Sequence, residues 1–338
     1  MSLNSQSSIL ASIGNTPLVK LQGISKSLNA NVYAKLEGLN PGMSIKDRTV
    51  LCMIEQAESE GLITPGVSTI VEASSGNTGY SLAMICGIKG YKCIVTVKDK
   101  ASKEKINMIK AMGAEVVLCP SGAKPDDPDS YYEKAKSISE SIEHAFYINQ
   151  NFNLYNQKAH YKTTGPEIWE QTDGKITYLI SPASTGGTIS GIAKFLKEKN
   201  PAIKVISADS EGSVLKKYHE TNEYDKSLKK KTWLEGVGKD IIPPNISMDH
   251  IDEFLIVNDE RSVENIIHLA KTEGIMAGGS SGAAMEALCQ VKDRLTSDDT
   301  VVLIFSDHGS KYLSKFYDTE WQVDNGLETI ENVIRVTE

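Results

Sequence analysis

Apolar positions along the chain fall into two alternating patterns. Short runs rich in β-branched residues, typical of buried strands, are followed by longer segments in which apolar residues recur at helical spacing. In the first half, the pattern predicts strands at 68–73, 92–98 and 114–119, with helices at 78–90 and 102–113 between them. Strand–helix–strand units with crossovers this short favour a parallel, right-handed sheet covered by helices.

The same alternation returns in the second half, after a segment of less clear pattern near 120–150. The predicted elements are strands at 175–183, 204–209 and 300–307 and helices at 187–199, 262–274 and 281–295. Two such series predict an α/β protein with two lobes. We expect a small-molecule site in the cleft between the lobes, where ligands of such folds commonly bind.

The charge balance and the hydropathy argue against nucleic-acid and membrane partners. The 36 Lys and Arg residues are outnumbered by 44 Asp and Glu, which gives a formal net charge of −8. Nucleic-acid affinity comes mainly from clustered Lys and Arg, so this balance disfavours a nucleic-acid partner. No apolar run approaches the roughly 18 residues of a membrane span, and the polar start of the chain lacks the pattern of a secretory signal. We therefore expect no membrane partner.

The cysteines and histidines form neither a disulfide pattern nor a metal-ligand pattern. Five cysteines occur without a CxxC pair, which favours thiols in a reducing compartment and predicts a cytoplasmic protein. The six histidines show no metal-ligand spacing, so no metal site is predicted. For His160 and His308, we favour hydrogen-bonded structural side chains over places in a cleft.

The strongest chemical signal is STGGT (184–188), which lies directly between a predicted strand and a predicted helix. Its hydroxyl and glycine residues are Ser184, Thr185, Gly186, Gly187 and Thr188. Backbone N–H groups and the positive end of the helix dipole converge there, and glycine lets the backbone approach a ligand closely. The pattern indicates a phosphate site, with a tight turn that needs glycine for geometry alone as the alternative. It matches neither a P-loop nor a GxGxxG fingerprint.

Other loops carry candidate residues that are weak signals alone. SSGNTG (74–79) follows another predicted strand and suits a carboxylate at a helix N-terminus, although a capped turn is favoured for this loop alone. Lys46 follows a Pro-Gly turn at the start of a helical run. It can be interpreted as an amine nucleophile or as a solvated surface charge. The remaining candidates resemble connecting loops: Gln150, EGVG (235–238), AGGSSG (277–282) and SDHG (306–309).

Taken together, six segments carry a family resemblance. They are GNTPLVKL (14–21), NPGMSIKDR (40–48), EASSGNTGYSLA (72–83), STGGTISGIAKFLKE (184–198), EGVGKDIIPP (235–244) and GGSSG (278–282). In this order they resemble the fold-type II pyridoxal-phosphate (PLP) enzymes of the cysteine synthase/cystathionine β-synthase family over nearly the whole chain. AHYKTTGPEIWEQTDGK (159–175), ADSEGSVL (208–215) and KYLSKFYDTEW (311–321) are most similar to the catalytic core of cystathionine β-synthases. We expect neither the regulatory C-terminal domain pair nor the N-terminal haem site of some members.

The resemblance implies a two-lobed α/β fold with parallel, twisted sheets covered by helices. It also implies a large cofactor-binding domain from residues 1–43 and 150–338, and a smaller, mobile substrate-side domain from residues 44–149. Lys46 matches the catalytic lysine that holds PLP as an internal aldimine, and Asn77 matches a residue that contacts the 3′ oxygen of the cofactor. Residues 184–188 match the phosphate loop.

The resemblance further assigns the substrate site. The residues that match the carboxylate-binding loop and its neighbours are Ser74, Ser75, Asn77, Thr78 and Gln150, with Gly236 in the turn that closes over the active site. The family reads Thr where this chain has Ser74, which keeps the hydroxyl. Where the family tail reads Leu-Pro followed by Ser or Asp-Ser, this chain reads FSDH (305–308). Ser306 is therefore the candidate contact of the pyridine nitrogen, with Asp307 and His308 as alternatives.

The implied activity is a PLP-dependent β-replacement on serine, cysteine or an activated serine through an α-aminoacrylate. The expected nucleophile is a thiol, first homocysteine, giving cystathionine and water or hydrogen sulfide. Two alternatives use the same residues: O-acetylserine with sulfide, which gives cysteine, and an amine nucleophile, as in diaminopropionate-forming synthases. An inactive binding or sensor protein with this fold is the alternative from another class. The resemblance also implies a homodimer.

Overall fold

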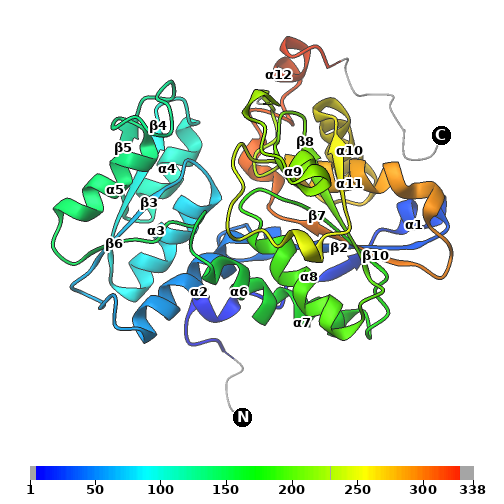
Figure 1. Cartoon of the computed structure of the whole chain (residues 1–338), viewed down its shortest axis with the longest axis horizontal. Helices are drawn as coiled ribbons and strands as arrows, with labels where there is room; N and C mark the ends of the chain where they lie inside the picture. The colour runs from blue at the N-terminus through cyan, green and yellow to red at the C-terminus, as the bar shows by residue number, and fades with distance from the viewer. Residues whose placement is uncertain (1–4, 229, 328–338) are drawn as a thin grey trace. The chain divides into compact units, whose positions relative to one another are not determined.

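The computed structural model describes residues 5–228 and 230–327, which fold as two compact units (Figure 1). Unit 1 takes its residues from 1–13 and 40–159, and unit 2 from 14–39 and 160–338. The boundaries expected from sequence differ from this division at the described residues 5–13, at 40–43 and at 150–159, which are assigned to unit 1. For residues 5–13 the reason is packing, because Leu10 and Ile13 lie against the apolar core of unit 1.

Unit 1 is built on a four-stranded, fully parallel sheet in the order β5-β4-β3-β6. The strands are β3 (Thr69–Ala73), β4 (Lys92–Lys98), β5 (Glu115–Cys119) and β6 (Ala145–Tyr147). The helices are α2 (Lys46–Ser59), α3 (Asn77–Lys89), α4 (Lys103–Ala111) and α5 (Tyr131–Ser141), preceded by the 3₁₀ helix η1 (Ile9–Ser12). The short crossovers thus give the parallel sheet that the pattern predicts.

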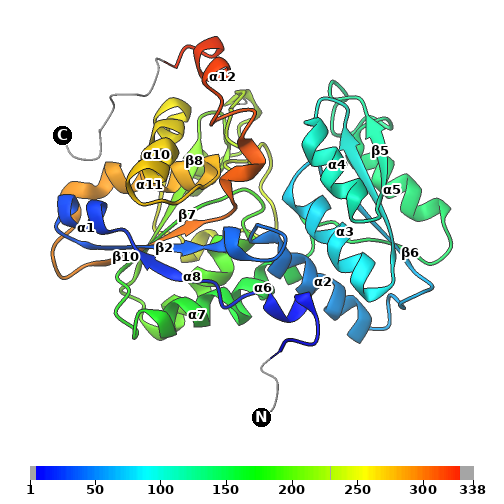
Figure 2. The ribbon, with the colours of Figure 1, turned by 180° about the vertical axis from the view of Figure 1, so that it is seen from behind.

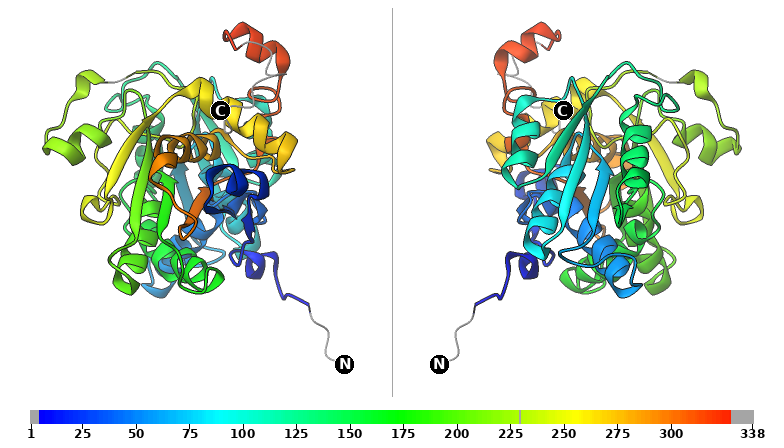
Figure 3. Two further views of the ribbon diagram at one scale, coloured as in Figure 1. Left: turned by 90° about the vertical axis from the view of Figure 1, so that its right-hand side faces the viewer. Right: turned by 90° about the vertical axis from the view of Figure 1, so that its left-hand side faces the viewer.

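Alternate side chains of the central strands face two different helical layers. Ile70 and Val95 pack into the cluster that includes residues of α2 and α3. Their neighbours Val71 and Ile94 point to the other face, where Ala135 of α5 covers them. Figure 3 (right) shows the strands of this unit between helices on both sides. Burial on both faces explains why β3 and β4 are mostly apolar and do not alternate between apolar and polar residues.

Unit 2 contains a six-stranded sheet in the order β1-β2-β10-β7-β8-β9, in which only the β1–β2 pair is antiparallel. The strands are β1 (Leu18–Lys20), β2 (Asn31–Leu36), β7 (Tyr178–Pro182), β8 (Lys204–Ser210), β9 (Glu253–Val257) and β10 (Thr300–Phe305). The helices are α1 (Gln22–Leu28), α6 (Tyr155–Lys162, which spans the division at Ala159), α7 (Thr164–Gln171), α8 (Gly187–Lys199), α9 (Leu215–Thr221), α10 (Asp259–Thr272), α11 (Gly279–Val291) and α12 (Thr319–Asp324). Short 3₁₀ helices are η2 (Glu37–Leu39), η3 (Lys226–Leu228), η4 (Met248–His250), η5 (Lys292–Arg294) and η6 (Gly309–Tyr312).

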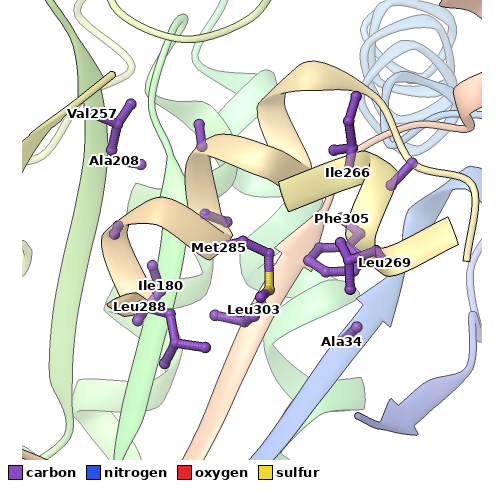
Figure 4. Close-up of a cluster of buried hydrophobic side chains, with 14 of the residues drawn as sticks. Ala34, Ile180, Ala208, Val257, Ile266, Leu269, Met285, Leu288, Leu303 and Phe305 are labelled. Atoms are coloured by element: carbon purple, nitrogen blue, oxygen red, sulfur yellow. The ribbon is translucent and has the colours of Figure 1, made fainter. Parts of the chain in front are cut away.

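The core of unit 2 lies between its sheet and the pair α10 and α11 (Figure 2). Figure 4 shows Met285 and Leu288 of α11 lying over Ile180 and Leu303 of the central strands. On the other side, α8 lies against β7, and α7 against α8. The sheet of unit 2 is thus covered by helices, as that of unit 1 is.

Most predicted elements are present, and two of them match at both ends, β4 and α8. The segment of less clear pattern contains α5 and the short strand β6. Strands β1, β2 and β9 were not predicted from the pattern. None of the five cysteines forms a disulfide. Within residues 5–228 and 230–327, no helix has the length and apolarity that crossing a bilayer requires.

Candidate active site

The loop between β7 and α8 has a backbone that only glycine fits. Gly186 caps α8 with a φ of +83°, in the left-handed region. A Cβ on Gly186 would lie 2.5 Å from the Cβ and 2.8 Å from the backbone nitrogen of Ile246. Ser190 Oγ accepts a hydrogen bond from the Ser247 N–H at 2.8 Å and so fixes the same turn to α8. The loop is therefore seated on residues 245–247.

The donors of this loop suit an anion. α8 has no acidic residue in its first turn, so the positive end of its dipole is not neutralised from within the helix. Thr185 is buried, whereas Ser184 and Thr188 are half-buried. Among the described residues, the Ser184 hydroxyl has no hydrogen-bond partner. Backbone amides, two accessible hydroxyls and the helix dipole together fit a phosphate group.

The EGVG turn is fixed to this loop at one end. The Gly238 N–H donates to the carbonyl oxygen of Ala183, the residue before the loop, at 2.7 Å. Lys239 N–H donates to Ser213 Oγ at 3.1 Å, which ties the same end to the segment after β8. Gly236, by contrast, is exposed, has a φ of +78° and has open space where its Cβ would be. The turn is thus anchored after Gly236 and unobstructed at Gly236 itself.

The three candidates at the end of β10 differ in their surroundings. Asp307 is buried, and its Oδ2 accepts a hydrogen bond from the Tyr312 hydroxyl at 2.7 Å. His308 Nδ1 accepts from the Ser310 N–H at 3.1 Å. The Ser306 hydroxyl has no hydrogen-bond partner among the described residues. Ser306 is thus the one of the three whose side chain makes no hydrogen bond to a described residue.

The AGGSSG turn lies beside this strand end, which the sequence does not indicate. The Gly278 N–H donates to the Asp307 carbonyl oxygen at 3.2 Å. Ser280 and Ser281, in the first turn of α11, are both buried, and Ser281 Oγ makes no hydrogen bond to any described residue. The feature of the sequence that could have indicated this site is a pair of serines that directly follows two glycines at the start of a helix. Ser280 and Ser281 thus bring two further hydroxyl candidates to the strand end that carries Ser306.

In unit 1, Asp47 holds the loop that precedes Lys46 through hydrogen bonds. Asp47 is buried, and its carboxylate accepts hydrogen bonds from the Gly42 N–H and from Ser81 Oγ, each at 2.5 Å. A Cβ on Gly42 would lie 2.2 Å from Asp47 Oδ1, so only glycine allows this approach. Lys46 is the first residue of α2, and its N–H donates to Ser44 Oγ at 3.4 Å. Asp47 therefore fixes the backbone from which Lys46 projects.

The SSGNTG loop joins β3 to α3 and is held by its own hydroxyls. Ser74 Oγ accepts hydrogen bonds from the N–H groups of Gly76, at 3.3 Å, and Gly79, at 3.1 Å. Ser75 Oγ accepts from the Lys98 N–H at 2.9 Å, which ties the loop to β4. Thr78 Oγ1 donates to Gln150 Oε1 at 2.6 Å. The structure thus brings Gln150 to this loop, although the two are 72 residues apart.

The buried carboxyl group of Glu72 accepts hydrogen bonds from Gln150 and so helps to position it. Glu72 is fully buried on β3, and its Oε2 accepts from the Gln150 N–H at 3.3 Å. Burial raises the pKa of Glu72 to about 8, because hydrogen bonds from Gln150 offset only part of the lost hydration. Sequence analysis did not identify Glu72 as a candidate. The feature that could have indicated it is a single acidic residue within the otherwise mostly apolar strand TIVEA.

The candidate residues are divided between the two units. Lys46, Gln150 and the loop of residues 74–78 belong to unit 1. The loop 184–188, with Gly236 and Ser306, belongs to unit 2.

Comparisons with known proteins agree on one family. The family model for pyridoxal-phosphate-dependent enzymes matches residues 9–307. The chain is 40% identical to the cystathionine beta-synthase of Saccharomyces cerevisiae over 334 residues, 96% of this chain and 65% of that protein. It is 37% identical to cysteine synthase 1 of Emericella nidulans over 318 residues, 93% of this chain and 85% of that protein. A solved structure of a hydrogen sulfide-producing enzyme from Fusobacterium nucleatum superposes with a TM-score of 0.82 at 37% identity, covering 91% of this chain and 100% of that chain.

These matches differ in length. The chain spans 65% of the yeast protein that it matches and a larger share of the fungal cysteine synthase. The superposition with the solved structure covers the whole length of that chain. Because the family model covers most of the chain and several relatives exceed 30% identity, the chain belongs to the family of pyridoxal-phosphate-dependent enzymes.

Proposed function

We propose that this protein catalyses a PLP-dependent β-replacement in which the β substituent of serine or cysteine is exchanged for a thiol. With homocysteine as the thiol, serine gives cystathionine and water, and cysteine gives cystathionine and hydrogen sulfide. The observation that carries the proposal is the phosphate loop at the N-terminus of α8, in a chain that belongs to the PLP-dependent family. The 40% identity to a cystathionine beta-synthase supports homocysteine as the acceptor.

The residues present fit the cofactor. PLP, when bound, supplies an electron-poor ring that stabilises negative charge at the Cα of an amino acid. The loop 184–188 would hold its phosphate, and Lys46 would hold its aldehyde. Asn77 would contact the 3′ oxygen. The Ser306 hydroxyl, or Ser280 from the neighbouring turn, would contact the ring nitrogen.

Lys46 would also move the α proton of the substrate. A lysine amine takes up such a proton as a general base, which is the role proposed for Lys46 at the first position of α2. Asp47 would hold the backbone of this residue through Gly42 and Ser81 while the side chain moves. Accurate placement of the base is what converts proximity into rate.

The SSGNTG loop would bind the substrate carboxylate. Thr78 and Gln150 are joined by a hydrogen bond, and the loop backbone lies at the start of α3, where the helix dipole favours an anion. Gly236, with open space at its Cβ position, would let the EGVG turn approach the bound substrate.

The test is to identify the product for each pair of substrates. The purified holoenzyme is incubated with serine, cysteine or O-acetylserine, each with homocysteine or sulfide, and products are assigned by mass. We expect cystathionine from serine with homocysteine, and cystathionine with hydrogen sulfide from cysteine. Matched incubations without the acceptor control for release from the donor alone. Absence of cystathionine under every condition would reject homocysteine as the acceptor.

A second candidate function is cysteine synthesis from O-acetylserine and sulfide, which the 37% identity to a cysteine synthase supports. It predicts that only O-acetylserine changes the visible absorbance of the bound cofactor. A protein that stays colourless after incubation with PLP would instead support a binding protein without catalysis.

We also infer that the protein is a cytoplasmic homodimer that takes a small amino-acid donor and a thiol. The family resemblance supports the dimer, and the absence of disulfides among five cysteines supports a reducing compartment. Light scattering coupled to size exclusion at micromolar concentration is expected to give twice the chain mass of 36.9 kDa. A monomer mass at that concentration would contradict the dimer.

A further inference from the structure

One buried histidine lies directly behind the phosphate loop. His160 is fully buried at the end of α6, and its Nε2 lies 3.2 Å from Thr188 Oγ1. Its Nδ1 lies 2.9 Å from Oγ1 of Thr164, the first residue of α7, which is also fully buried. The imidazole therefore connects a hydroxyl of the phosphate loop to a hydroxyl of the neighbouring helix, all within unit 2.

The surroundings of Thr164 determine which ring nitrogen carries the proton. Among the described residues, the Thr164 hydroxyl makes a hydrogen bond only with His160 Nδ1. A buried hydroxyl hydrogen without an acceptor is costly, so Thr164 must donate to Nδ1. Nδ1 is then the unprotonated nitrogen and Nε2 carries the proton. Consequently the Nε2–H group donates to Thr188 Oγ1.

This direction decides what Thr188 offers to a ligand. Thr188 Oγ1 accepts from His160, so its own hydrogen stays available, and the side chain has no other partner among the described residues. The opposite tautomer would use that hydrogen on the ring and turn lone pairs toward the ligand. A phosphate oxygen needs donors, so only the first arrangement makes Thr188 useful at the N-terminus of α8.

We propose that His160 is a positioning residue for the phosphate of the cofactor: it receives a hydrogen bond from Thr164, donates one to Thr188 and so orients the Thr188 hydroxyl as a donor to a phosphate oxygen. The proposal rests on the phosphate loop assigned under the proposed function. It implies that His160 discriminates phosphorylated ligands from unphosphorylated ones and does not contact the pyridine ring.

The test compares ligands that differ only in the phosphate. Apoenzyme of the wild type and of H160L, H160Q, T188V and the double variant H160L/T188V is titrated with PLP and with pyridoxal, and Kd is taken from absorbance. A second readout, independent of Lys46 and of turnover, is the thermal shift of each apoenzyme with inorganic phosphate. Leucine keeps the bulk of the imidazole, whereas the glutamine amide can donate from near the Nε2 position.

We expect H160L to weaken PLP about 10- to 100-fold, the range for one hydrogen bond to a charged group, and to leave pyridoxal within about twofold. The thermal shift with inorganic phosphate should fall in parallel. H160Q should recover most of the PLP affinity. Because the histidine acts through Thr188, the double variant should be no weaker than T188V alone.

The possible negative results of this experiment can be distinguished from one another. If H160L weakens PLP and pyridoxal equally, or if its effect adds to that of T188V, the role of His160 is merely structural and the positioning proposal is wrong. If T188V weakens PLP and H160L does not, the proposal fails while the phosphate loop stands. If neither variant changes PLP affinity, the phosphate loop assignment fails, and the positioning role fails with it.

Discussion

K46A should lower the turnover number of the holoenzyme by at least about 10³-fold, because it removes both the proposed attachment point of the cofactor and the proposed base. The measurement is the steady-state rate of cystathionine formation from serine and homocysteine. A second measurement reduces the wild-type holoenzyme with borohydride and maps the cofactor-bearing peptide by mass. That peptide should contain Lys46 in the wild type and should be absent from K46A.

The matched control for this variant is K103A. Lys103 is the exposed first residue of α4, as Lys46 is the first residue of α2, so both variants remove one lysine side chain at the same helix position in the same unit. K103A is expected to keep turnover within about twofold, since single surface charges contribute little. Appreciable turnover in K46A, or a reduced cofactor on another lysine, would contradict the assignment.

Burial alone does not select the reactive lysine, as Lys35 shows. Lys35 is fully buried on β2, yet its Nζ donates to the Thr16 carbonyl oxygen at 2.7 Å, to Glu167 Oε2 at 2.7 Å and to Gln171 Oε1 at 2.9 Å. Three acceptors, one of them a carboxylate, hold this amine as a cation. Lys35 thus serves to fix the first segment of unit 2 to α7.

The alternation of strands and helices could be predicted from sequence wherever the strand is buried on both faces. β4 and β10 are such runs, because helices cover both sides of each sheet. β1 has only three residues, all at least partly exposed, at the edge of its sheet and carries too little apolar pattern to be seen. β6, of three half-buried residues, is an edge strand as well. Their shortness explains why they were missed better than their edge position does, because the five-residue edge strand β5 was predicted.

The candidate site, too, could be predicted from sequence only in part. The loop 184–188 could be predicted because a glycine-rich turn between a strand and a helix has a local physical meaning. The pairings of His160 with Thr188, and of Glu72 with Gln150, could not, since the partners lie 28 and 78 residues apart. Sequence alone favours a structural histidine at 160, and the structure shows a fully buried one whose partner belongs to the candidate site.

Glu72 makes the stability of the protein depend on pH in a definite direction. Its pKa is 4.5 in an ordinary setting and about 8 in the fold, where burial disfavours the carboxylate. Between these values the folded state keeps a proton that the unfolded state has released. The free energy of unfolding therefore falls as pH rises from about 4.5 to about 8, and the contribution of the neutral carboxyl is fully present only below that window. The loss is about 3 to 4 kcal/mol between pH 5 and pH 8.

E72Q should remove this dependence. The glutamine amide keeps the shape of the neutral carboxyl and an oxygen that accepts from the Gln150 N–H, but it cannot ionise. We expect E72Q to lie within about 1 kcal/mol of the wild type at pH 5 and to be more stable by about 3 kcal/mol at pH 8. The measurement is urea unfolding of the holoenzyme, followed by far-UV circular dichroism at fixed PLP concentration, across this range.

The decisive quantity is the difference in unfolding free energy between E72Q and the wild type at each pH, because every other titrating group cancels in it. E115Q, which removes an exposed carboxyl from β5 of the same sheet, is the matched control and should follow the wild-type curve. A difference that stays constant from pH 5 to pH 8 would show that Glu72 is already ionised in the fold. Gln150 would then be held by a buried carboxylate, and its N–H would donate to a full negative charge beside the proposed substrate site.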